Sequence, residues 1–129
     1  MKHDAVQSVE DLQVFKRAYE LSLDVHRLTL GFPKTEQFGG LADQLRRSSK
    51  SICALVAEGS GRQRGSKVEF KRYVIMAIGS ADETKLWCRY AADLGYIDRA
   101  TYEAWSDGYS QVARMLQALA SSLASSSEH

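Results

Sequence analysis

Hydrophobic residues recur at intervals of three and four along most of the chain, which is the spacing of one face of an α-helix. Four such segments follow one another, at about residues 8–30, 39–58, 66–94 and 99–123. Each segment has an apolar face wide enough to pack against other helices. Runs of alternating apolar and polar residues, which would predict strands, are missing from the sequence. The pattern therefore predicts an all-α protein.

Short polar and glycine-containing sequences set the predicted helix ends. The sequence Gly31-Phe32-Pro33 is expected to end the first helix, because the residue before proline disfavours the helical conformation. Gly59 is expected to close the second, because glycine is favoured just beyond a helix end. Ser66 with Glu69 three residues later is a capping box for the third helix. Gly95 ends that helix, and Asp98 is a good cap for the fourth.

The connections between the four segments are only a few residues long, which favours an antiparallel up-down-up-down four-helix bundle. The chain of 129 residues is long enough for one core, so residues 1–129 are predicted to form a single domain. In the last segment Trp105, Tyr109 and Leu116 share a seam with the 3.5-residue period of coiled-coil packing. The serine-rich residues 121–129 are expected to fray.

Several features predict a cytoplasmic protein. The two cysteines, Cys53 and Cys88, lie in apolar helical stretches and are expected to be reduced and buried. The N-terminus is polar and lacks the apolar run of a signal peptide. No stretch approaches the roughly 18 apolar residues of a membrane-spanning helix.

Residue patterns that support catalysis or metal binding are hard to find. No glutamate is followed three residues later by histidine, the pair used in di-metal bundles. A Cys/His nucleophile would need His26 beside one of the cysteines, and nothing in the sequence places them together. The sequence therefore predicts a protein without catalytic residues, metal or cofactor. An enzyme that uses Glu58 and an arginine is a weaker alternative.

Positive charge is concentrated in one segment, residues 46–72. This segment has eight cations against Glu58 and Glu69, a net charge of +6, whereas the whole chain carries +1. A polyanionic partner would explain this concentration, with the cations contacting phosphates without reading bases. A solvated basic surface without a ligand is the other interpretation. The candidate nucleic-acid-binding residues are Arg46, Arg47, Lys50, Arg62, Arg64, Lys67, Lys71 and Arg72.

Five blocks of sequence occur in the order of one protein family: Phe32–Gly39, Gln44–Ser48, Ala57–Gly59, Ile78–Glu83 and Leu94–Ile97. Over about Val9–Leu119 the chain resembles the bacterial four-helix bundle proteins encoded in intervening sequences of 23S rRNA genes. It is also similar to the accessory protein of diversity-generating retroelements. The resemblance implies a homopentameric ring. For the retroelement relative it further implies that a basic surface binds nucleic acid and a reverse transcriptase.

The leading hypothesis is a non-enzymatic, oligomeric bundle that binds RNA or DNA, with a protein partner such as a reverse transcriptase. The alternative is a protein–protein adaptor whose basic segment docks an acidic partner protein. Apolar surface including Trp87, Trp105 and Tyr109 is expected to support a closed oligomer. Gly79, in the middle of the third helix, predicts a close approach of another backbone, either within the bundle or from another subunit.

Overall fold

A computed structural model describes residues 12–62 and 66–127, except for the side chains of residues 62 and 124–127. Its elements are α2 (Gln13–Thr29), the short 3-10 helix η2 (Lys34–Glu36), α3 (Leu41–Arg62), α4 (Lys67–Asp93) and α5 (Arg99–Ser127). No strand occurs in these described ranges. The prediction of an all-α fold with four long helices is confirmed for this part of the chain.

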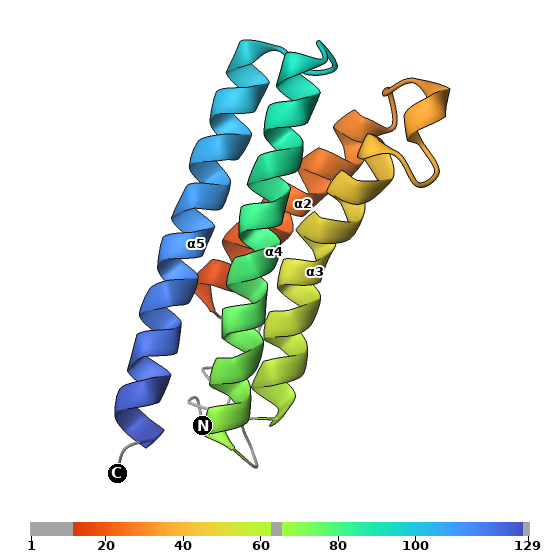
Figure 1. Ribbon diagram of the computed structural model, residues 1–129. Helices are drawn as coiled ribbons and strands as arrows, with labels where there is room; N and C mark the ends of the chain where they lie inside the picture. Colours follow the sequence, from red (N-terminus) through yellow and green to blue (C-terminus); the bar gives the residue numbers. More distant parts are fainter. Residues whose placement is uncertain (1–11, 63–65, 128–129) are drawn as a thin grey trace.

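Three of the long helices, α3, α4 and α5, lie side by side, and α2 crosses behind them at an angle (Figure 1). Both α3 and α5 pack against α2 and against α4, so α2 and α4 occupy opposite sides of the shared core. Between α3 and α4, Thr84 Oγ1 donates to Ser48 Oγ at 2.8 Å, and the hydroxyl oxygens of Ser51 and Ser80 lie 3.0 Å apart. In these two pairs the residue number in α3 rises from 48 to 51 while the residue number in α4 falls from 84 to 80.

The core contains the predicted seam of α5. Tyr109, Val112 and Leu116 are completely buried, and Trp105 is 1% exposed. Trp105 also donates its Nε1 hydrogen to Asp24 Oδ2 at 2.7 Å, which fixes the indole against α2. The prediction that Trp105 and Tyr109 supply surface for oligomerisation is therefore wrong, because the face that carries them is turned inward.

The ends of α4 and α5 follow their local sequence signals. Ser66 Oγ accepts a hydrogen bond from the backbone N–H of Glu69 at 3.1 Å, which caps α4. Gly95, just after α4, has φ +80°, a conformation that glycine adopts without strain. Asp98 Oδ1 accepts from the N–H of Thr101 at 2.8 Å and caps α5.

Two helices extend beyond their predicted ends. The second was expected to end at Glu58, but α3 continues to Arg62. A Cβ at Gly59 would lie 2.6 Å from the Cβ of Tyr73, so this glycine permits close packing of α4 against α3. The serine-rich tail, which was expected to fray, is helical through Ser127, and Leu123 within it is buried in the core. At the other end, the predicted helical positions 8–11 lie outside the described residues.

No helix within 12–62 and 66–127 is long and apolar enough to cross a membrane.

Candidate nucleic-acid interface

The fold divides the basic segment into two groups. Arg46, Arg47 and Lys50 lie in the first three turns of α3, whereas Lys67 and the cations at 71 and 72 lie at the start of α4. From position 50 to the end of α3 at position 62 the helix rises roughly 18 Å. The predicted segment is therefore not one continuous patch.

Arg46 is built into the connection between α2 and α3. Its Nη1 donates to Thr29 Oγ1 at 3.0 Å, and its Nη2 donates to the backbone oxygen and to Oε1 of Gln37, both at 3.1 Å. Gln37 Nε2 in turn donates to the carbonyl oxygens of Thr29 and Phe32 at 2.9 and 3.0 Å. With its donors used in this way, Arg46 is a structural residue in the described conformation.

Lys50 lies in a cationic cluster with residues of α2. Its Nζ is 2.9 Å from Nδ1 of His26, in the last turn of α2. The charge of Lys50 lowers the pKa of His26, and desolvation, Arg46 and Arg27 lower it further. The imidazole is therefore held in its neutral form, which accepts a hydrogen bond from the ammonium group. The contact between Lys50 and His26, with Arg46 and Arg27 nearby, concentrates positive charge on the surface shared by α2 and α3.

The other predicted cations differ in their surroundings. Arg47 and Lys67 are exposed, Lys71 is half-buried, and none of the three forms an ion pair within the described residues. Arg72 pairs with Glu69 at 3.1 Å, and its guanidinium carbon lies 5.1 Å from the centre of the neighbouring tyrosine ring. Arg64 and the side chain of Arg62 lie outside the described residues.

Sequence reasoning missed the contribution of α2 to this surface. His26 was considered in the sequence only as a partner for a cysteine nucleophile, and Arg27 was not considered. A signal was present, because the two basic residues occupy the last turn of a helix that a short connection joins to the basic start of α3. A hairpin of helices brings such turns together.

The structure gives little support to nucleophilic catalysis by the cysteines. Burial raises the pKa of Cys53 to about 11 and that of Cys88 to about 12, so both remain thiols at neutral pH. Among the described residues, no group of three His, Cys, Asp or Glu side chains is placed to hold a metal. Glu58, the other catalytic candidate, accepts a hydrogen bond from the Tyr73 hydroxyl at 3.3 Å.

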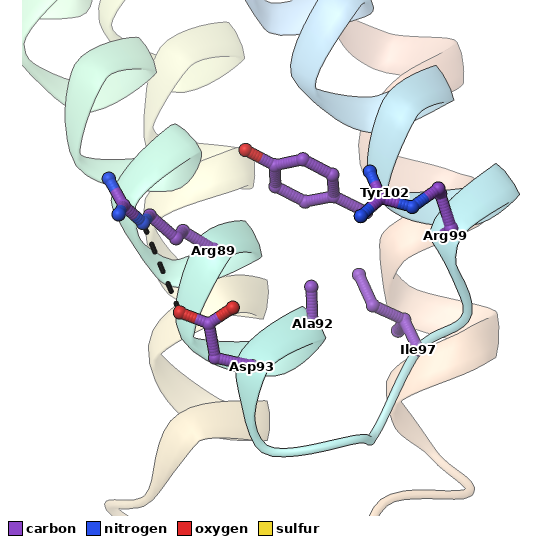
Figure 2. Close-up of a pocket in the computed structure, with 6 residues that line it drawn as sticks. All are labelled: Arg89, Ala92, Asp93, Ile97, Arg99 and Tyr102. Atoms are coloured by element: carbon purple, nitrogen blue, oxygen red, sulfur yellow. Dashed lines mark ion pairs between the residues drawn. The ribbon is translucent and has the colours of Figure 1, made fainter.

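A cavity of about 330 Å³ lies at the turn between α4 and α5 (Figure 2). Its lining includes two arginines, but each has an acidic partner. Arg89 Nε is 3.9 Å from Asp93 Oδ2, and Arg99 Nη1 is 3.5 Å from Glu103 Oε2. The cavity therefore has less uncompensated charge for an anion than the cluster around His26.

The fold and the surface define a class: a small bundle of four long α-helices with a cationic cluster where α2 meets α3. Comparison of the sequence with known protein families shows which family the chain belongs to. The sequence profile of the 23S rRNA-intervening sequence proteins matches residues 10–118, and the chain belongs to this family.

A solved structure has the same fold. It is a protein of unknown function of the S23 ribosomal protein family from Bacteroides thetaiotaomicron, with a TM-score of 0.73 and 22% identity. The match covers 83% of this chain and 97% of that chain. No curated protein matches the chain.

Proposed function

We propose that the protein is a non-enzymatic, self-associating bundle that binds the phosphate backbone of nucleic acid. The observation that carries this proposal is the contact of Lys50 with His26, near which Arg46 and Arg27 add positive charge. Exposed Arg47 lies about one turn before Lys50 on α3. Like charges held together on a surface are mutually unfavourable, and a polyanion relieves this repulsion.

The proposal also covers the order of the helices, the assembly, the protein partner and the location. The contact pairs between α3 and α4 support an antiparallel, up-down-up-down order of helices. The five-subunit ring and the reverse transcriptase partner implied by the resemblance stay predictions, as does the cytoplasmic location. The molar mass in solution tests the first of these, with five times 14.4 kDa expected for a ring of five.

Fluorescence anisotropy with labelled duplex DNA and with RNA, from about 50 to 300 mM salt, tests the binding site. The test variant is Arg27→Gln/Lys50→Gln. The control is Arg89→Gln/Arg114→Gln, which removes the same charge from exposed positions elsewhere. If each cluster cation neutralises one phosphate, the slope of log K against log salt on duplex DNA becomes less negative by about 1.8 in the test variant.

Because phosphate contacts carry no base information, the loss of affinity is expected to be similar for unrelated sequences. The control variant is expected to keep the wild-type slope. Equal effects of both variants would contradict the assignment of the site. Absence of binding by the wild type at the lowest salt would overturn the nucleic-acid proposal and favour the adaptor.

A further inference from the structure

Phe38 lies on the connection between α2 and α3, which projects at one end of the bundle (Figure 1). It is 94% exposed, whereas the other eight exposed large apolar residues of the described chain are between 44% and 63% exposed. Both faces of its ring are therefore open to a ligand. Single exposed apolar residues are common on protein surfaces, so the structure around Phe38 decides whether this exposure has a role.

Hydrogen bonds on both sides fix the backbone of Phe38 in this exposed position. Before it, the carbonyl oxygen of Gln37 accepts a hydrogen bond from Arg46 Nη2 at 3.1 Å. After it, the N–H of Gly39 donates to Asp43 Oδ2 at 2.8 Å. Gly39 has φ +75°, a conformation that glycine adopts without strain. Because the backbone already holds the ring outward, little further conformational entropy is lost when the ring binds a ligand.

The connection is also anchored to the rest of the bundle. Glu36 Oε1 accepts a hydrogen bond from the N–H of Leu41 at 2.7 Å, and Glu36 Oε2 accepts one from the Tyr96 hydroxyl at 2.9 Å. A Cβ at Gly40 would lie 2.6 Å from the Cα of Glu36, so this glycine permits the tight turn. The carboxylates of Glu36 and Asp43 thus both serve to hold the connection in one conformation.

Positive charge connects the exposed ring with the contact of Lys50 and His26. Arg46 donates to Gln37, the residue before Phe38, and Lys50 follows about one turn later on α3. Position 50 is roughly 13 Å along the helix from its start at position 41. A few nucleotides of one strand, at about 3.4 Å or more each, span this distance. A strand whose phosphate contacts Lys50 can therefore place a base at Phe38.

An unpaired base fits this site better than an apolar protein surface. Between positions 30 and 40, Leu30 is the only other exposed large apolar residue, and the remaining exposed positions are Lys, Thr, Gly or Pro. Protein interfaces surround their anchors with a larger apolar patch. An aromatic ring near cations is the usual platform for bases, because every base has a π-face. Bases inside a duplex cover one another, so only an unpaired base can stack on Phe38.

We infer that Phe38 is a stacking platform for an unpaired base of a nucleic acid whose phosphates contact the surface around Lys50. This inference rests on the proposed function and narrows its ligand to single-stranded RNA or DNA, including the loops and ends of folded RNA. Because stacking is largely independent of base identity, Phe38 adds affinity for unpaired strands without reading a sequence. Duplexes bind through phosphate contacts alone.

Fluorescence anisotropy with three labelled probes tests the inference: a single-stranded DNA oligonucleotide, the same strand with abasic sites in place of its bases, and the duplex. Phe38→Ala is expected to weaken binding of the normal single strand about fivefold or more. Its affinities for the abasic strand and for the duplex are expected to equal those of the wild type. Leu30→Ala, which removes the other exposed apolar side chain of the connection, is the control and is expected to change none of the three affinities.

Substitutions that keep or remove the ring separate stacking from apolar contact. Phe38→Trp keeps a π-face and is expected to retain or raise the affinity for the single strand. Phe38→Leu keeps an apolar side chain without a ring and is expected to lose affinity as Phe38→Ala does. The slope of log K against log salt is expected to be the same in all Phe38 variants, since no charge is removed. Circular dichroism verifies that each variant keeps its helices.

Failure of this inference is distinguishable from failure of the proposed function. A wild type that binds all three probes, with Phe38→Ala equal to it on the single strand, would overturn the stacking role and leave phosphate binding standing. Equal losses of Phe38→Ala on all three probes, or full single-strand affinity of Phe38→Leu, would overturn stacking in the same way. A wild type that binds no probe even at the lowest salt would overturn both proposals.

Discussion

Arg46 and Arg47 are neighbours in sequence with different predicted roles, which makes them a matched pair for mutation. Arg46→Ala removes the three hydrogen bonds that join the start of α3 to Thr29 and Gln37. Arg47→Ala removes an exposed side chain without an ion pair among the described residues. Both variants lose the same charge and gain the same helix propensity.

The expected cost follows from these contacts. A hydrogen bond from a charged donor contributes about 1.5–3 kcal/mol, but the acceptors on Gln37 are partly accessible and regain water. The buried Thr29 hydroxyl keeps its bond to the carbonyl oxygen of Val25 at 2.7 Å. We therefore expect Arg46→Ala to lower the free energy of unfolding by about 2–3 kcal/mol. Arg47→Ala is expected to stay within about 0.5 kcal/mol of the wild type.

Urea denaturation followed by circular dichroism measures the difference between the two variants. In the nucleic-acid binding assay the two variants are expected to rank the other way, because Arg47→Ala should weaken binding whereas Arg46→Ala should not. Arg46→Lys adds a control that keeps the charge but cannot reach all three acceptors, and it is expected to be destabilised nearly as much as Arg46→Ala. Equal stability of Arg46→Ala and Arg47→Ala would refute the structural assignment of Arg46.

Other substitutions test the core and the cationic cluster. Leu116→Ala, at a completely buried position, is expected to cost about 2–5 kcal/mol by denaturation, and a loss under about 0.5 kcal/mol would contradict its burial. Gly59→Ala is expected to destabilise by more than about 1 kcal/mol, because the new Cβ meets that of Tyr73, although alanine is the better helix former. The pKa of His26 in the wild type, measured by NMR, is expected to lie below 6.5. Lys50→Gln is expected to raise this pKa toward 6.5, because it removes the neighbouring charge. An unchanged pKa in the variant would contradict the contact between Lys50 and His26. Because the folded state disfavours the protonated imidazole, the His26 contribution to stability is complete above pH 6.5 and is lost as the pH falls through the folded-state pKa.

Much of the fold is determined by local sequence. Apolar residues at intervals of three and four specify helices whatever lies around them, because the α-helix itself has that period. Ser66, Gly95 and Asp98 act within a few residues of their own position, and the structure uses them as their sequence predicts. These features need no knowledge of distant parts of the chain.

Other features depended on contacts between helices. Gly59 has the sequence signature of a helix end, yet it lies inside α3 because α4 packs against it. Trp105 was expected to be available for oligomerisation, but packing of α5 on α2 places it in the core.

The candidate site depended on tertiary structure in the same way. The concentration of cations between positions 46 and 72 is visible in the sequence, but the sequence did not separate Arg46 from Arg47 or bring His26 to Lys50. Adjacent residues on a helix point about 100° apart, so one step along the chain moves a guanidinium from an internal hydrogen-bond network to solvent. Charge composition is a property of the sequence, whereas the availability of each charge depends on the groups that other helices place around it.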